Sequence, residues 1–177
     1  MAATQILLAG FGGQGVLFAG KFLAYKGLSQ GKQLSWLPSD GPEMRGGTAN
    51  CSVILSDTPV GSPIITNPDV LVAMNLPSLQ KFVDTVAPGG TIILDSTLID
   101  MKVEREDVTV YYIPATQMAK DAGFATLANM ILMGKVIKET KAVRFDNNLE
   151  TLQSFIPAKK AKLIDINCQA LQAGYDF

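Results

Sequence analysis

The sequence predicts an α/β fold, a three-layer sandwich in which helices cover both faces of a mainly parallel sheet. Short apolar runs recur along the chain, and segments with helical spacing of apolar residues lie between them. Only 18% of the residues are charged, against a typical ~25%, which fits strands that are apolar on both faces. The 177 residues are expected to form one domain, residues 1–177, because neither an internal repeat nor a long linker divides them.

In the first half of the chain, the elements are marked by glycine and proline. A buried strand is expected at 5–9, where an apolar run ends at a glycine. The apolar spacing then becomes helical from 15 to 30. Strands are expected at 33–37 and 48–55, separated by a loop rich in glycine and proline.

The second half continues with a buried strand at 70–74 and a helix that begins near Pro77 and is stopped by Pro88-Gly89-Gly90. Strands at 91–95 and 108–113 follow. Helical spacing then predicts helices at 116–122, 125–139, 147–154 and 159–172. Strand, glycine, helix and strand follow one another as in βαβ units, so the sandwich is expected to be Rossmann-like.

Lysines within the expected helices are assigned to solvated faces. The apolar spacing of the first helix leaves Lys21 and Lys26 on its outer side. Lys135, Lys138 and Lys141 are likewise expected to face the solvent.

Composition excludes several kinds of function. The chain has 15 basic and 16 acidic residues, no histidine and a net charge of −1, which argues against nucleic acid as a partner. Without histidine there is neither a Ser-His-Asp nor a Cys-His catalytic set. Cys51 and Cys168 are too few for a four-thiolate zinc or iron–sulfur site and are expected to be reduced, so we predict no metal site. We find neither a basic leader nor an apolar run long enough for a membrane segment. A cytoplasmic location is therefore expected.

The segment Gly10-Phe11-Gly12-Gly13-Gln14-Gly15 matches G-x-G-x-x-G between a strand and a helix. Such glycines permit a tight turn and let backbone N–H groups approach an anion or a cofactor phosphate. A nicotinamide dinucleotide also needs an acidic residue ~20 positions further on, and residues 35–39 contain none there. The alternative is a turn needed only for strand–helix packing, and Gly12 is expected to require the absence of a Cβ. The candidate cofactor-binding residues here are Gly10, Gly12, Gly13, Gln14 and Gly15.

A second polar loop spans residues 39–50 and is expected beside the first, at the carboxyl ends of the strands. The forked guanidinium of Arg45 suits a phosphate or a carboxylate. In an extended chain Glu43 shares a side with Arg45 and can pair with it, so the alternative is that this pair, with Asn50, only pins the loop. The candidate cofactor-binding residues of this loop are Glu43, Arg45, Gly46 and Gly47, and no residue of the chain is predicted to be catalytic.

Between Gly46 and Gln80 only Asp57 and Asp69 are charged. Buried strands account for part of this depletion. The other cause is a surface made to be covered by other chains, because interface cores are also poor in charge.

These motifs resemble those of one family, the gamma subunit or gamma domain of 2-oxoacid:ferredoxin oxidoreductases. The resemblance rests on the segments 10–16, 39–50 and 88–96, and it covers nearly the whole chain. Gly-Pro-Glu-Met-Arg-Gly-Gly at 41–47 is far more specific than a lone glycine motif. The sequence of this loop resembles that of the 2-oxoglutarate and 2-oxoisovalerate enzymes more than that of the pyruvate enzyme. One difference is Asp40, which stands where many relatives carry an aromatic residue.

The resemblance implies a multi-subunit enzyme that converts a 2-oxoacid and CoA to an acyl-CoA and CO2 and reduces ferredoxin. It implies thiamine diphosphate, Mg and 4Fe-4S clusters in the complex, but none is expected to be bound by this chain alone. The implied partners are alpha, beta and ferredoxin-like delta subunits, with ferredoxin as the electron acceptor. The gamma chain would complete or cover the active-site region, and the isolated chain is expected to self-associate.

Two other interpretations remain open from the residues themselves. One is a free-standing nucleotide-binding oxidoreductase that uses the Gly10–Gly15 loop. The other is a non-enzymatic interaction module whose loops only shape the fold.

Overall fold

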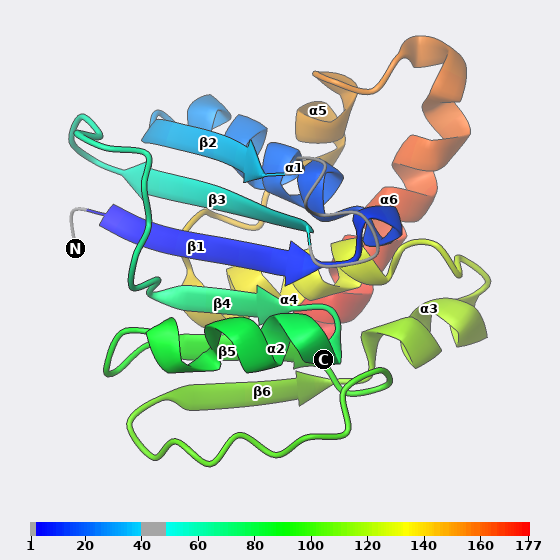
Figure 1. The fold of residues 1–177 in the computed structure, drawn as a ribbon. Helices are drawn as coiled ribbons and strands as arrows, with labels where there is room; N and C mark the ends of the chain where they lie inside the picture. Colours follow the sequence, from blue (N-terminus) through cyan, green and yellow to red (C-terminus); the bar gives the residue numbers. More distant parts are fainter. Residues whose placement is uncertain (1–2, 40–48) are drawn as a thin grey trace.

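At the centre of the molecule lies a six-stranded sheet with the spatial order β2-β3-β1-β4-β5-β6 (Figure 1). The computed structural model describes residues 3–39 and 49–177. The strands are β1 (Ala3–Gly10), β2 (Gln33–Ser39), β3 (Ala49–Ser56), β4 (Val70–Ala73), β5 (Thr91–Asp95) and β6 (Thr109–Ile113). Each of them matches a predicted strand to within about two residues at either end.

The sheet is mixed, because β3 runs against the other strands. The pairs β1–β4, β4–β5 and β5–β6 are parallel, whereas β3 is antiparallel to both β1 and β2. The α/β class is therefore confirmed, with the correction that one strand interrupts the parallel order. The cause is a short connection: only residues 40–48 separate β2 from β3, and a parallel return needs a crossover of about a dozen residues or more.

Helices flank the sheet on both faces (Figure 1). They are α1 (Val16–Ser29), α2 (Leu76–Phe82), α3 (Ala115–Ala122), α4 (Ala128–Thr140), α5 (Asn148–Gln153) and α6 (Ala161–Asp176). Short 3₁₀ turns are η1 (Gly12–Gln14), η3 (Val83–Thr85) and η4 (Ala158–Lys160). Successive residues of β1 point to opposite faces, so Ile6 and Leu8 pack in the core that holds α1, α4 and α6, and Leu7 packs in the core that holds α2.

Two lysines that were predicted on solvated helix faces are buried. Lys26 in α1 is fully buried, and its Nζ donates a hydrogen bond to the backbone carbonyl of Asp146. Lys135 in α4 is 6% exposed, pairs with Glu139 at 2.5 Å and lies over the ring of Tyr111. The prediction for both was wrong because further chain packs onto these helices, α5 onto α1 and α6 onto α4.

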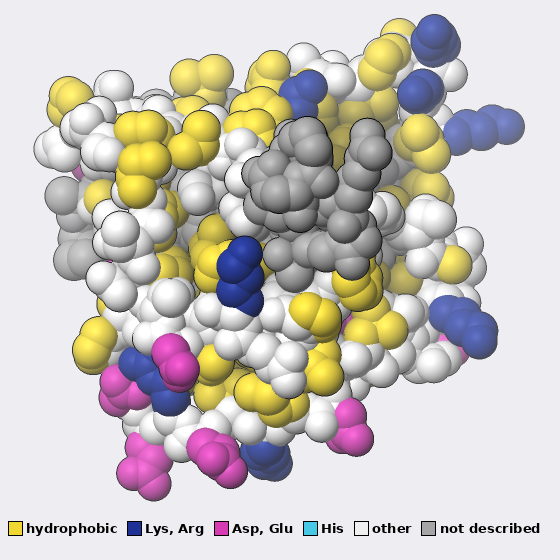
Figure 2. All heavy atoms as spheres, viewed as in Figure 1, with side chains coloured by type: hydrophobic (Ala, Val, Ile, Leu, Met, Phe, Trp, Pro, Cys, Tyr) yellow, Lys and Arg dark blue, Asp and Glu magenta, His cyan; other side chains and the backbone are white. Residues whose placement is uncertain are grey.

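Figure 2 shows where side chains of different kinds lie on one face of the molecule. Apolar side chains gather over β2 and β3, whereas acidic side chains gather near β6 at the lower left. Leu37 and Ile64 are 39% and 62% exposed and line one shallow pocket beside β2 and β3. The charge-poor stretch 46–80 thus includes buried strands, as well as Ile64 on the surface. Within the described ranges, we find no helix that is both long and apolar enough to cross a bilayer.

Candidate functional site

The carboxyl ends of β1, β4 and β5 meet at one edge of the sheet. Ala9 of β1 pairs with Ala73 of β4, which pairs in turn with Leu94 of β5. The helix after β1, α1, packs on one face of the sheet, and the helix after β4, α2, packs on the other (Figure 1). The gap between β1 and β4 is therefore a topological switch point, where open α/β sheets bind ligands.

The predicted glycine loop leaves β1 at this switch point. The turn η1 follows Phe11, and Gly15 has a φ of 73° in the left-handed region. The helix α1 then begins at Val16, and no described side chain caps its N-terminus. Uncapped N–H groups at a helix N-terminus carry partial positive charge and attract anions.

Two glycines of the loop are required by the fold. A Cβ on Gly10 would lie 2.7 Å from Gln14 Oε1 and 2.9 Å from Met74 Cβ. A Cβ on Gly15 would collide with Asn129 Nδ2, in a backbone conformation that L residues rarely adopt. Strand, loop and helix therefore approach each other more closely at these two positions than a side chain would permit.

The other two glycines are not required in this way. Gly12 and Gly13 are exposed, and a Cβ on either would meet no atom of residues 3–39 and 49–177 within 4 Å. The expectation that Gly12 must lack a Cβ for the turn itself was wrong, because the glycine that takes the left-handed conformation is Gly15. At Gly12 and Gly13 the loop therefore presents bare backbone that no described side chain covers.

Gln14 ties the loop to the next strand. Its Oε1 accepts a hydrogen bond from the Phe11 N–H at 2.6 Å, and its Nε2 donates one to the Met74 carbonyl at 2.9 Å. Asn75 Nδ2 lies 3.5 Å from the same Oε1, while Asn75 Oδ1 accepts from the Ser78 N–H at 2.9 Å and caps α2. The predicted site residue Gln14 thus couples the glycine loop to the junction of β4 and α2.

Two side chains that the sequence did not mark as site residues complete this edge. Asn129 in α4 donates from Nδ2 to the Gly15 carbonyl at 3.0 Å, across 114 positions of sequence. Asp95, at the end of β5, is 1% exposed and accepts from the Thr116 hydroxyl at 2.5 Å and from the Thr97 N–H at 3.1 Å. The contact of Asn129 is tertiary, so no local pattern could have indicated it.

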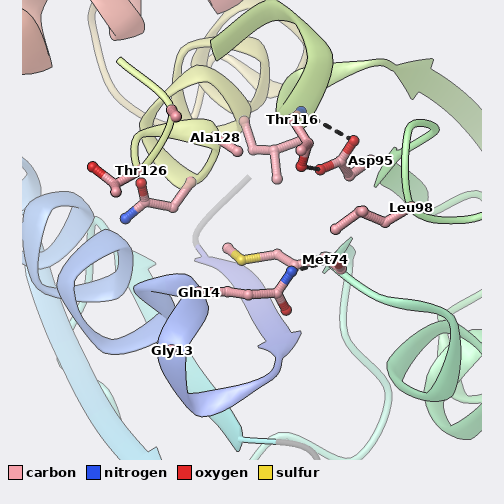
Figure 3. A pocket seen from close by; sticks show the side chains of 11 residues that line it. Gly13, Gln14, Met74, Asp95, Leu98, Thr116, Thr126 and Ala128 are labelled. Carbon is pink, nitrogen blue, oxygen red and sulfur yellow. Dashed lines mark hydrogen bonds between the residues drawn. The ribbon is translucent and has the colours of Figure 1, made fainter. Parts of the chain in front are cut away.

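These elements enclose a pocket of about 290 Å³ (Figure 3). Figure 3 shows Gln14 and Met74 on one side of the pocket, and Asp95 hydrogen-bonded to Thr116 on the other. The pocket is lined by Gly13, Gln14, Met74, Asp95, Leu98, Thr116, Ala125, Thr126, Ala128, Asn129 and Leu132. These described lining residues include a carboxylate and no lysine or arginine, so the pocket accepts hydrogen bonds but offers no positive side chain.

Four predicted site residues lie outside the described residues: Glu43, Arg45, Gly46 and Gly47. Both ends of their segment are described. Ser39 of β2 pairs with Asn50 of β3, and Ala49 pairs with Gly10 of β1. The chain therefore leaves and re-enters the sheet beside the glycine loop, where the sequence predicts the second loop.

The cysteines do not form a reactive site. Cys51 and Cys168 are both free, and Trp36 Nε1 donates a hydrogen bond to Cys51 Sγ at 2.8 Å. Burial raises the pKa of the Cys51 thiol to about 11, so it stays protonated at neutral pH and is a weak nucleophile. Within residues 3–39 and 49–177 no group of three or more His, Cys, Asp or Glu side chains could hold a metal ion.

Comparison with known proteins gives a match along nearly the whole chain. Residues 5–177 match the family model described as pyruvate ferredoxin/flavodoxin oxidoreductase. The ketoisovalerate oxidoreductase subunit VorA of Methanothermobacter thermautotrophicus is 40% identical over 174 residues, which are 98% of this chain and 36% of VorA. The 2-oxoglutarate synthase subunit KorC of Methanocaldococcus jannaschii is 31% identical over 175 residues, which are 97% of this chain and 92% of KorC.

A solved structure agrees with these sequence matches. The keto/oxoacid ferredoxin oxidoreductase gamma subunit from Geobacter sulfurreducens superposes with a TM-score of 0.84 at 27% identity, covering 98% of this chain and 96% of that one. The chain spans 92% of KorC but little more than a third, 36%, of VorA.

Proposed function

This chain belongs to the pyruvate ferredoxin/flavodoxin oxidoreductase family, and we propose that it is the gamma subunit of a multi-subunit 2-oxoacid:ferredoxin oxidoreductase. The family match confirms the resemblance seen in the sequence. In the proposed reaction a 2-oxoacid, CoA and oxidised ferredoxin give an acyl-CoA, CO2 and reduced ferredoxin. The chain completes or covers the active-site region and is not catalytic alone. VorA and KorC are named for ketoisovalerate and 2-oxoglutarate, and we propose a substrate of one of these two types.

The observation that carries this proposal is similarity over nearly the whole length of two separate chains. The match covers 97% of this chain and 92% of KorC, and 98% of this chain and 96% of the Geobacter gamma subunit. A shared sheet alone would suit many functions. Similarity that includes both polar loops and the long C-terminal helices supports the same role within an assembly.

Within the assembly, we propose that the two loops form one surface that faces CoA or a partner chain. The uncapped start of α1 attracts phosphate, and the bare backbone at Gly12 and Gly13 permits close approach. We propose that Arg45 adds a forked cation to this surface, because Ala49, where the chain re-enters the sheet after the segment of Arg45, pairs with Gly10. This use of a glycine loop at a switch point is that of a Rossmann-like fold. The proposed contact residues are Gly10, Gly12, Gly13, Gln14, Gly15, Glu43, Arg45, Gly46 and Gly47.

The redox cofactors belong to other chains in this proposal. Thiamine diphosphate and Mg, which supply the decarboxylation chemistry, and the 4Fe-4S clusters are assigned to alpha, beta and ferredoxin-like delta subunits, and ferredoxin accepts the electrons. The described part of this chain offers no set of ligands for a metal ion. A cytoplasmic complex is part of the proposal, because free thiols such as Cys51 and Cys168 persist in reducing compartments.

The proposal is tested by affinity purification of the tagged chain from its native organism. We expect the chain to retain partners that carry thiamine diphosphate and iron, and the eluate to reduce ferredoxin with a 2-oxoacid and CoA. Recovery of the chain alone, with tight binding of NAD, NADP or FAD, would instead support a free-standing nucleotide-binding oxidoreductase. Recovery with partners that lack both thiamine diphosphate and iron would indicate a plain interaction module.

A further inference from the structure

Side chains tie the glycine loop to neighbouring elements of the fold. Gln14 donates from Nε2 to the Met74 carbonyl at 2.9 Å, and Asn129 of α4 donates from Nδ2 to the Gly15 carbonyl at 3.0 Å. Gly12 and Gly13 are exposed and have no side chain of their own to anchor them. Glycine also loses more conformational freedom on folding than any other residue. The loop therefore depends on such ties for a single conformation.

The bond from Asn129 is not needed to satisfy the Gly15 carbonyl. That oxygen already accepts the Ala19 N–H at 3.1 Å, in the first hydrogen bond of α1. A carbonyl oxygen has two lone pairs, so Asn129 supplies a second donor. Because ψ of Gly15 sets the direction of this carbonyl, the second bond restrains ψ, which is 33°, and with it the left-handed conformation of Gly15.

Asn129 is itself held by a rigid part of the fold. It is 5% exposed and lies in the first turn of α4. The helix α4 packs backbone to backbone on α6, because a Cβ on Gly134 would collide with the Leu171 carbonyl oxygen and a Cβ on Gly174 with the Ile131 carbonyl oxygen. A hydrogen bond shielded from water is also stronger than an exposed one. Asn129 thus ties the loop to a closely packed pair of helices.

We infer that Asn129 is a positioning residue for the proposed reaction, and that it holds the glycine loop in one conformation before the loop meets CoA. The inference rests on the proposed function, in which the start of α1 attracts a phosphate. A loop that is already ordered loses less entropy on binding, which raises affinity. Without the bond from Asn129, this loss moves to the binding step, so CoA binds more weakly while the chemical step keeps its rate.

Asn167 of α6 provides a matched control. It is 3% exposed, and its Nδ2 donates to the Leu163 carbonyl at 2.6 Å. That carbonyl belongs to α6 itself, so this bond does not reach the glycine loop. Asn129→Ala and Asn167→Ala therefore remove the same group from similarly buried sites, and only the first removes a tie to the loop.

The first test measures backbone NMR order parameters of Gly12 and Gly13 in the whole chain. We expect values of a rigid backbone, ~0.85, in wild type and Asn167→Ala, and a fall toward those of a flexible loop, ~0.6, in Asn129→Ala. Asn129→Asp has the same shape but presents an acceptor where the wild type donates, so it is expected to loosen the loop as well and serves if Asn129→Ala does not fold. Unchanged order parameters in the folded variant would overturn the inference.

The second test uses the complex reconstituted with partner subunits. We expect Asn129→Ala to raise the KM for CoA about tenfold, or about 1.4 kcal/mol, which is the size of fixing one residue's backbone, with kcat within about twofold of wild type. Asn167→Ala is expected to leave both constants unchanged, since loss of a merely structural bond would lower the melting temperature and not the affinity.

Three outcomes of the second test overturn the inference. They are an unchanged KM for CoA in Asn129→Ala, a fall in kcat alone, and a change confined to the amount of chain needed for full activity, which would assign the loop to a partner chain. If the wild-type chain supports no CoA-dependent activity at all, the proposed function fails, and the order parameters still decide whether Asn129 holds the loop.

Discussion

Replacing Lys26 with methionine is expected to remove a rise in stability that the wild-type protein shows as the pH increases above neutrality. Lys26 is fully buried in α1. The pKa of its amine is lowered from 10.5 to about 8, chiefly by burial; the carboxylate of Asp146 opposes this change, the nearby Arg144 adds to it, and Glu150 opposes it. The methionine side chain keeps similar length and apolar surface but carries no charge.

The sign and size follow from proton binding. Between pH 8 and 10.5 the unfolded chain binds more protons than the folded chain, so the free energy of unfolding increases with pH in this window. The pKa shift gives an increase of about 1.4 kcal/mol from pH 7 to 9 and about 2.5 kcal/mol from pH 7 to 10. At pH 7, Lys26→Met removes a burial penalty of about 3 kcal/mol but also a hydrogen bond from a charged amine, worth about 1.5–3 kcal/mol, so a net gain of up to about 1.5 kcal/mol is expected.

The raised pKa of Cys51, about 11, acts in the opposite direction, because the unfolded thiol loses its proton first and stability falls above pH 9. Cys51 is present in both wild type and Lys26→Met, so its effect cancels when their free energies of unfolding are compared at the same pH.

The assay is urea unfolding of wild type, Lys26→Met and the control Lys21→Met at pH 7, 8, 9 and 10. Lys21 lies on the same helix and is only partly buried. We expect the stability advantage of Lys26→Met to shrink steadily with pH, and the effect of Lys26→Met to change more with pH than that of Lys21→Met. An advantage of Lys26→Met that does not change with pH would refute the argument that a buried, charged amine costs stability.

Three further predictions concern the loops. Gly15→Ala is expected to lower the melting temperature by roughly 5 °C. The reason is that a non-glycine residue in the left-handed conformation costs about 1–2 kcal/mol, and that the added methyl group collides with Asn129. The same melting temperature for Gly15→Ala and wild type would contradict this. Gly12→Val is expected to melt like wild type but to assemble poorly with partner subunits, and normal assembly would remove Gly12 from the contact surface. Arg45→Ala should lower CoA-dependent turnover of the reconstituted complex tenfold or more, with partial recovery in Arg45→Lys, since the fork is lost but the charge is kept; wild-type turnover in Arg45→Ala would remove Arg45 from the site.

The strands and helices were predictable because each has a local signature. Apolar runs ended by glycine gave the strands, and apolar spacing gave the helices. The direction of β3 was not taken from the sequence, although the short connection at 40–48 would have indicated it. The burial of Lys26 was missed because it depends on α5, which lies far along the chain and packs onto α1.

The site was predictable in its position and less so in its detail. A glycine motif between strand and helix indicates the carboxyl edge of the sheet, and the pairing of Gly10 with Ala49 supports the expectation that the second loop lies beside it. Which glycine takes the left-handed conformation could not be read from the motif, and it is Gly15 rather than Gly12. Asn129 could not be found from the sequence, because its hydrogen bond to Gly15 exists only after folding.

Reconstitution of the enzyme from separate chains tests the central claim most directly. Recombinant alpha, beta and delta subunits are mixed with increasing amounts of this chain, and the reduction of ferredoxin by a 2-oxoacid and CoA is measured. We predict little activity without the chain and a rate that saturates when the chain is added in about equimolar amount. Full activity in its absence, or a rate that does not respond to its addition, would contradict the assignment of this chain as the gamma subunit.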